Sequence, residues 1–229
     1  MKENDKIEIH KCTDFEVDGN SQKDIWSKAE TIILKDSVTG KEIEGDQAKV
    51  KMAWSANGFY ILYEARDKHI WGTYKNDDDP LYDEEVVEIF ITGGLETPKK
   101  YFEFQFSPNG VKFDAKISNP TGDRSDAGFN VDVSWNCAGL KLAQTFDPPR
   151  HSGLDPESIP FAGTWWTEVF IPWESVEVKN AAIGTVLRAN LFRIDGYLEQ
   201  TSFQSWQPTL KDPPNFHVPE KFGYIELKG

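Results

Sequence analysis

The sequence predicts an all-β protein, an antiparallel β-sandwich or jelly roll of about ten to twelve strands. Three observations support this prediction. Short runs in which apolar and polar residues alternate recur along the whole chain of 229 residues. Turn signals rich in Gly, Pro, Asn and Asp separate these runs at intervals of roughly 8 to 15 residues. Helical periodicity is almost absent, and only residues 24–30 are expected to form a short helical turn.

The first half of the chain is expected to contain two short strands followed by a hairpin. Residues 7–10 and 31–34 are the short strands. Residues 48–54 and 59–65 alternate regularly and are joined by an Asn-Gly turn signal, which predicts an antiparallel hairpin. Residues 67–79 are polar, and we expect a long loop there, a kind of loop that usually has a function in a compact domain.

The second half contains further runs with the character of strands. They are residues 86–91, 101–106, 111–115, 131–135, 140–143, 164–171, 186–194 and 222–227. No internal repeat, linker or change of composition divides the chain. We therefore expect a single domain covering residues 1–229.

The charge of the chain limits its partners. It has 38 acidic and 25 basic residues, which give a formal net charge of −13. This charge repels phosphate backbones and no cluster of Lys or Arg offsets it, so nucleic acid is not an expected partner. No segment approaches the roughly 20 apolar residues that span a bilayer, so no membrane span is expected. The excess of carboxylates favours divalent cations, calcium above all.

The Cys and His residues give little support for a metal site or a network of disulfides. Cys12 and Cys137 allow at most one disulfide and lack the spacing of metal ligands. The four His are scattered, so no histidine zinc site is indicated. The N-terminus has no apolar core and does not resemble a signal peptide. We expect an extracellular or periplasmic protein if a signal was removed, and a cytoplasmic location stays open.

Residues 80–90 are the strongest candidate for a functional site. Glu88 interrupts the apolar run 86–91 and shares one face of that strand with apolar neighbours. Burying a carboxylate there costs roughly several kcal/mol unless it is paired or hydrogen-bonded. Tyr82 could place an aromatic ring near the same face, and an acid beside a ring is typical of a sugar site. Alternatively, Glu88 is a core acid neutralised by Arg193, a cation inside the apolar strand 186–194.

Five short motifs follow one another along the chain. They are Asp18-Gly19 followed by Trp26, Tyr60-Ile-Leu-Tyr-Glu-Ala-Arg-Asp67, Leu81-Tyr-Asp-Glu-Glu-Val-Val-Glu-Ile-Phe90, Trp166-Thr-Glu-Val-Phe-Ile-Pro-Trp173, and Asn215-Phe-His-Val-Pro-Glu-Lys-Phe-Gly-Tyr-Ile-Glu-Leu227. Their order and spacing resemble those of the family 9 carbohydrate-binding modules, from about residue 14 to residue 227. The resemblance implies a β-sandwich that binds a mono-, di- or polysaccharide and has no catalytic activity.

The resemblance also implies which rings hold the sugar. In characterised members two aromatic rings clamp a mono- or disaccharide. Tyr82 matches the first ring position, where better-known members have Trp, and Phe216 matches the second, with His217 as the alternative. A Tyr and a Phe offer less stacking area than two Trp, so we expect weak affinity.

The polar positions depart from the family pattern. Glu88 matches the acid that bonds the sugar hydroxyls. Glu103 and Gln105 lie near positions where the family has an Arg and an Asn, and this chain has neither residue there. Two other functions therefore stay open. One is an interaction or scaffold domain whose sugar site has decayed. The other is a glycan-cleaving enzyme that uses Glu88 and Glu103, which would need the two acids roughly 5 to 10 Å apart across a cleft.

Calcium is the cofactor that the resemblance implies, and haem is not expected. Bound calcium is common in the family, and Asp67 and Glu85 are the candidate ligands by their placement. Related sandwiches hold haem on a Met and a His. Here only Met1 and Met52 are available, and Met52 alternates with the core residues of its strand.

Overall fold

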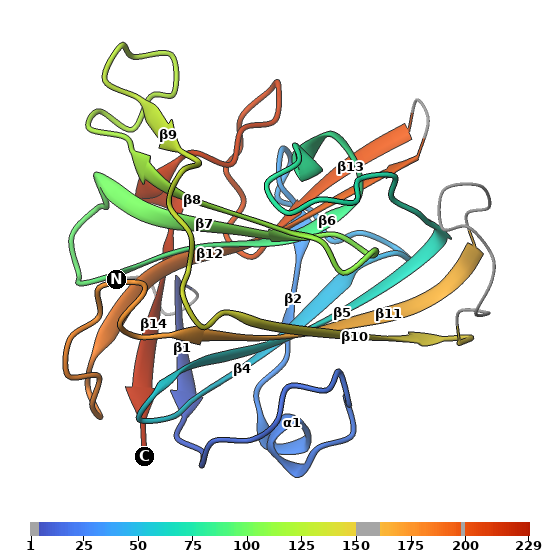
Figure 1. The fold of residues 1–229 in the computed structure, drawn as a ribbon. Coiled ribbons are helices and arrows are strands. Elements are labelled where there is room, and N and C mark those ends of the chain that lie inside the picture. The colour runs from blue at the N-terminus through green and yellow to red at the C-terminus, as the bar shows by residue number, and fades with distance from the viewer. Residues whose placement is uncertain (1–4, 150–160, 198–199) are drawn as a thin grey trace.

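The computed structural model describes residues 5–149, 161–197 and 200–229. Within these residues fourteen strands form two sheets that pack face to face, as Figure 1 shows. The predicted all-β sandwich is therefore confirmed. The described part contains more strands than expected because some are only two residues long, such as β2 (Ile32–Ile33) and β3 (Lys35–Asp36). Two residues are too few to show an alternating pattern.

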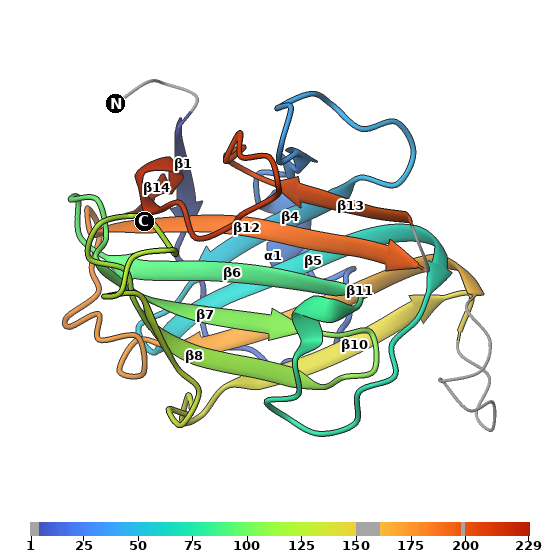
Figure 2. The same cartoon turned by 90° about the horizontal axis from the view of Figure 1, so that it is seen from above.

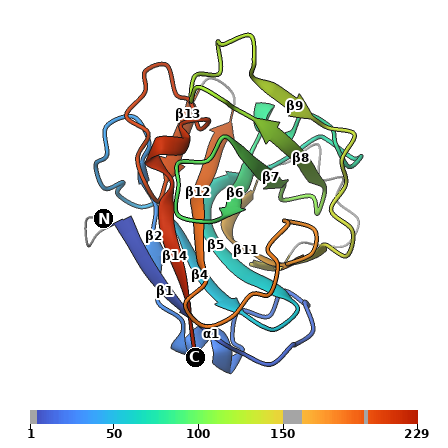
Figure 3. The same cartoon turned by 90° about the vertical axis from the view of Figure 1, so that its left-hand side faces the viewer.

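The larger sheet has nine strands. Its main path runs through β1 (Lys6–His10), β14 (Gly223–Lys228), β12 (Val186–Tyr197), β6 (Val86–Gly93), β7 (Lys100–Phe106), β8 (Lys112–Ser118) and β9 (Asn130–Asp132). Strand β13 (Gln200–Ser205) pairs with β12 and with β3. Strand β1 runs parallel to β14, and Figure 3 shows these two strands side by side with β12 next to them. The first and last strands of the chain thus close one edge of the sheet.

The smaller sheet has five strands in the order β10 (Lys141–Asp147), β11 (Phe161–Pro172), β5 (Gly58–Ile70), β4 (Ala48–Trp54) and β2. The predicted hairpin is present as β4 and β5. Strand β5 continues to Ile70, so the loop expected at residues 67–79 begins only after that residue. Helix α1 (Asp24–Lys28) covers the outer face of this sheet, where its Trp26 packs against an apolar cluster.

Alternation along the strands separates an inner face from an outer face in the larger sheet. Phe102, Phe104 and Phe106 of β7 point into the core between the sheets, as the sequence predicts. The opposite face of the same sheet holds a second apolar cluster, which includes Leu81 of the short helix η2 (Leu81–Asp83) and Phe222, directly after the short helix η3 (Pro219–Lys221). Figure 2 shows this face, with η2 lying against one end of it. The outer face is therefore largely covered instead of open to solvent.

The sequence also leads to expectations about the two cysteines and about membrane-spanning segments. Cys12 and Cys137 are both free thiols, the first half-buried and the second buried. In the part of the chain that the structure describes, no helix combines the length and the apolar character needed to cross a bilayer.

Candidate functional site

A single row of side chains crosses the outer face of the larger sheet. Strand register places Phe192 of β12 beside Glu88 of β6, Glu88 beside Gln105 of β7, and Gln105 beside Phe113 of β8. We call these four residues the Glu88 row. Neighbouring strands lie about 4.8 Å apart, so the row is about 14 Å long. It has two polar residues in the middle and an aromatic residue at each end.

An additional ring lies at each end of the Glu88 row. Phe216 stacks on Phe192, with centroids 4.1 Å apart and ring planes 15° from parallel. Tyr82, carried by η2, meets Phe113 edge-on, with centroids 6.1 Å apart. Tyr82 is 50% exposed, whereas Phe216 is 8% exposed. The two residues that the resemblance assigns to the ring positions therefore lie at opposite ends of one row.

The two polar residues of the row each have an oxygen atom without a partner. Glu88 Oε1 and Gln105 Oε1 are buried and form no hydrogen bond with any residue that the structure describes. Both side chains are only 1% exposed. The amide nitrogen of Gln105 donates one of its two N–H groups to Glu103 Oε1 at 2.7 Å. A buried polar atom without a hydrogen bond costs about 1–3 kcal/mol, and a ligand that donates to these oxygens would remove that cost.

The carboxyl groups of the site have perturbed pKa values. Burial raises the pKa of Glu88 well above its usual range, and the nearby charge of Glu103 raises it further. Burial also raises the pKa of Glu103 to about 7, against the opposing effects of the Gln105 hydrogen bond and the charge of Arg124. Both carboxyl groups therefore keep their protons to a higher pH than a solvent-exposed glutamic acid does.

His217 is part of a hydrogen-bonded chain beside the row. Its Nδ1 lies 2.8 Å from the hydroxyl of Tyr101, and Asn119 Nδ2 lies 3.4 Å from that hydroxyl. The hydroxyl accepts from Asn119, so Tyr101 connects Asn119 to the ring of His217. Nε2 lies 3.9 Å from Glu103 Oε2. Burial lowers the pKa of His217 to about 3, so this contact is not an ion pair at neutral pH.

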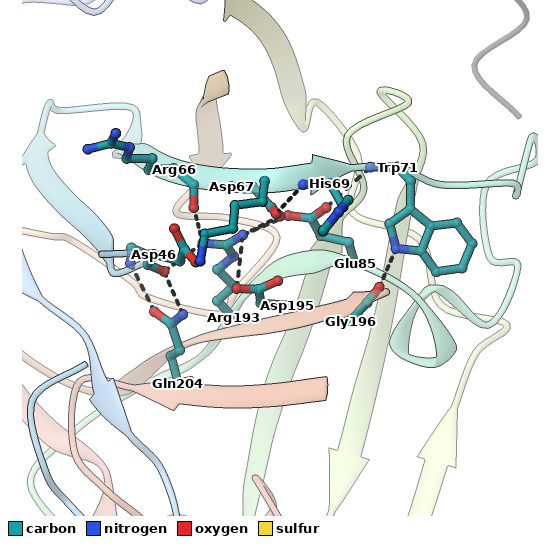
Figure 4. Close-up of polar contacts among 12 residues, drawn as sticks. Asp46, Arg66, Asp67, His69, Trp71, Glu85, Arg193, Asp195, Gly196 and Gln204 are labelled. Atoms are coloured by element: carbon teal, nitrogen blue, oxygen red, sulfur yellow. Dashed lines mark hydrogen bonds and ion pairs between the residues drawn. The ribbon is translucent and has the colours of Figure 1, made fainter. Parts of the chain in front are cut away.

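Arg193 lies on the opposite face of β12, between the two sheets. Its Nη2 donates to Asp67 at 2.6 Å and to Glu85 at 2.9 Å, and its Nη1 donates to the backbone oxygen of Arg66 (Figure 4). The interpretation that Arg193 neutralises Glu88 is therefore wrong. Alternation along β12 turns Phe192 toward the face of Glu88 and the next residue, Arg193, inward.

The two predicted calcium ligands do lie together, with a third acid. One carboxylate oxygen from each of Asp67, Glu85 and Asp195 lies within 4.8 Å of the other two. Asp195 is not among the ligands predicted from the sequence, although it follows Arg193 by two residues and so shares its face of the strand. Calcium takes oxygen ligands at about 2.3–2.6 Å, so oxygens up to about 4.8 Å apart fit one ion.

Burial and neighbouring charges shift the pKa values of the three acids in different directions. Burial raises the pKa of Glu85 well above its usual range, and it raises the pKa of Asp195 to about 6. Burial acts in the same direction on Asp67, but a hydrogen bond with Glu85 and the charge of Arg193 outweigh it and lower the pKa of Asp67. Three carboxyl groups thus share one guanidinium, and a divalent cation would compensate the remaining negative charge. A cavity of about 810 Å³, lined partly by Asp67, borders the cluster.

The fold and the Glu88 row define a β-sandwich whose outer face combines aromatic rings with buried hydrogen-bond acceptors, as a binding module for small polar ligands does. The chain belongs to the family described as Carbohydrate family 9 binding domain-like, whose model matches residues 17–229. The resemblance inferred from the motifs is therefore confirmed.

Individual proteins agree with this family assignment. The chain is 31% identical over 193 residues to a protein of Arthroderma benhamiae named "Extracellular protein", and the match covers 78% of each chain. A structure of a Bacteroides uniformis protein superposes with a TM-score of 0.72 at 16% identity and covers 97% of this chain and 99% of that one.

Two solved structures of Caldicellulosiruptor kristjanssonii are family 9 carbohydrate-binding modules. The complex with glucose has a TM-score of 0.64 at 17% identity and covers 98% of this chain and 96% of that one. The complex with cellotriose has a TM-score of 0.63 at 17% identity and covers 98% of this chain and 94% of that one. At such low identity the superpositions show a shared fold.

Proposed function

We propose that this protein binds a carbohydrate at the Glu88 row and does not catalyse a reaction on it. The observation that supports the proposal best is the row itself, which has two unpartnered buried acceptors between aromatic ends. Family membership supports it too, because two modules of the same fold were solved with glucose and with cellotriose.

The chemistry of a sugar matches this row. A pyranose offers C–H groups to aromatic faces and hydroxyl donors to acceptors, and Glu88 Oε1 and Gln105 Oε1 are acceptors that need donors. Both side chains are almost fully buried, so a sugar has to displace what covers them. Tyr82 is half exposed and touches the row through an edge contact, which makes it the ring that can turn aside most easily.

The placement of the two acids argues against a glycosidase. Such enzymes hold one carboxyl group on each side of the bond that they cleave. Glu88 and Glu103 project from neighbouring strands of one sheet face, where Glu88 pairs with Gln105 and Glu103 pairs with Phe90. Both acids would approach a sugar from the same side, which suits hydrogen bonding better than cleavage.

Replacing Tyr82 by Ala is expected to weaken sugar binding by about tenfold, since an aromatic contact contributes about 0.5–1.5 kcal/mol. Isothermal titration with glucose and cellotriose measures the effect. The melting temperature should hardly change, because Tyr82 is half exposed. Tyr224→Ala is the matched control, since Tyr224 lies on the same face of the sheet at β14, beside Arg188.

The same titration separates the main proposal from its rival. The near-complete burial of Glu88 and Gln105 favours an interaction domain that has lost its sugar site. If neither the wild-type protein nor Tyr82→Ala binds any sugar of a broad panel, the rival is correct. Equal affinities of wild type and Tyr82→Ala would remove Tyr82 from the site.

We also propose that Asp67, Glu85 and Asp195 hold a structural calcium ion. The ion would tie β5, η2 and β12 together by compensating buried negative charge. Saturating calcium should raise the melting temperature by about 5–10 °C, as expected for an ion present at about a hundred times its dissociation constant. The measurement is thermal unfolding after EDTA treatment, with calcium or magnesium added back.

Asp195→Asn is the test variant for the calcium site, because Asp195 is the most exposed of the three acids. Its melting temperature should respond much less to calcium than that of the wild type. Asp77→Asn removes a surface acid whose side chain pairs with Lys112, and it should keep the full response. An equal response in the Asp195→Asn protein would place any calcium elsewhere.

We further propose that the protein works outside the cell. The Arthroderma benhamiae relative is named as an extracellular protein. Polysaccharide ligands are also found there, so the location agrees with the proposed ligand.

A further inference from the structure

We infer that the Glu88 row, together with Glu103, selects a sugar with a protonated amine, such as a 2-amino-2-deoxyhexose, over the neutral sugar of the same shape. This inference rests on the proposed function and specifies its ligand. It follows from the balance of donors, acceptors and charges around the row.

The site has more acceptors than donors. Glu88 Oε1 and Gln105 Oε1 lack partners among the described residues, and Glu103 Oε2 lies 3.9 Å from the neutral ring of His217. Gln105 Nε2 uses one of its two N–H groups for Glu103 Oε1. An ammonium group has three N–H donors and no acceptor, so it complements such a site better than a hydroxyl does.

The cations of the neighbouring strand are committed elsewhere. Arg193 of β12 points to the inner face, where Asp67 and Glu85 hold it. Arg188 shares the outer face, but its Nη2 donates to the backbone oxygens of Phe222 and Pro219. Neither guanidinium is free to neutralise the acids of the row.

Among the described residues, the remaining groups around Glu88 and Glu103 place no cation in contact with either acid. His217 is neutral, since burial lowers its pKa to about 3, and its Nδ1 lies 2.8 Å from the Tyr101 hydroxyl. Arg124 is exposed and acts on Glu103 through its charge. The raised pKa values of Glu88 and Glu103 show the consequence, because buried carboxyl groups without a counter-ion retain protons. A bound ammonium would replace those protons as the counter-charge.

The test compares three sugars that share one ring stereochemistry. Glucosamine, glucose and N-acetylglucosamine are titrated into the full protein by calorimetry, below the pKa of the free amine. We expect glucosamine to bind about tenfold tighter than glucose, because a charge-assisted hydrogen bond is roughly twice as strong as a neutral one. N-acetylglucosamine has the same nitrogen without the charge, so it should show no such advantage.

Two variants separate the site from the general negative charge of the protein. Glu103→Gln keeps the shape of the side chain and removes its charge, and the ratio of the glucosamine and glucose affinities should fall to about one. Glu177→Gln removes one charge from an exposed position and should leave that ratio unchanged. Circular dichroism confirms that both variants are folded.

The outcomes distinguish this inference from the proposed function. Glucose binding equal to or tighter than glucosamine binding in the wild type overturns the inference and leaves carbohydrate binding in place. An equal loss of preference in Glu103→Gln and Glu177→Gln also overturns it, because the preference would then come from net charge. If none of the three sugars nor cellotriose binds, the proposed function fails and the inference fails with it.

Discussion

Replacing Arg193 by Met should lower the free energy of unfolding by about 3–5 kcal/mol, the usual cost of removing one partner from a buried ion pair. The side chain of Arg193 is fully buried, and so is that of its partner Glu85. Its second acidic partner, Asp67, is 6% exposed. Met fills a similar volume without charge, so the loss comes from stranded carboxyl groups and not from a cavity. Urea unfolding in the presence of EDTA measures it without a contribution from calcium.

A second substitution tests the cause of this loss. Glu85→Gln in the Arg193→Met background removes one stranded acid and should recover at least about 1 kcal/mol. Arg66→Met changes the same residue type on β5, where the side chain is exposed, and should change stability by less than about 0.5 kcal/mol. A loss below about 1 kcal/mol for Arg193→Met would mean that the acids are already neutral or otherwise compensated.

Replacing Glu168 by Ala should lower the free energy of unfolding by about 2–4 kcal/mol, because it strands several buried donors at once. Glu168 lies on β11 and is fully buried. It accepts from Trp26 Nε1 at 2.8 Å, from the backbone nitrogens of Asp18 and Gly19 at 2.9 and 3.0 Å, and from Lys23. One carboxylate therefore fixes the segment around α1 to the smaller sheet.

Glu64→Ala is the matched control for this prediction. Glu64 also bonds a Trp Nε1, that of Trp166, and a Lys, Lys49, but its side chain is 38% exposed. An exposed ion pair contributes about 0–1 kcal/mol, so this variant should lose much less stability than Glu168→Ala. Equal losses in the two variants, measured by urea unfolding, would show that the burial of Glu168 is not what makes its contacts strong.

The alternating pattern predicted much of the fold because the period of two residues is a local property of a strand. It placed Phe102, Phe104 and Phe106 in the core, and it put Glu88 on one face of its strand. It failed where local signals are weak. The strands β2 and β3 are too short to alternate, and β5 continues into the polar residues before Ile70 because it pairs with β11 there.

In the candidate site too, the sequence pattern predicts the face on which a side chain lies but not the partners that it meets there. Glu168 resembles Glu88 in sequence, since each is an acid among apolar neighbours in a strand, yet one is fully hydrogen-bonded and the other has an unpartnered oxygen. The pattern gives no information about this difference. Which donors reach a buried acid depends on segments far away along the chain, such as residues 18–26 for Glu168.

The sequence by itself determined the all-β class, the family and the side of each strand on which Glu88, Glu103 and Gln105 lie, because all three follow from local order along the chain. Only the tertiary structure decided the register that aligns Phe192, Glu88, Gln105 and Phe113, and the partners of Arg193. Register and ion pairing are contacts between distant segments, and the free energy that fixes them comes from packing the whole sheet.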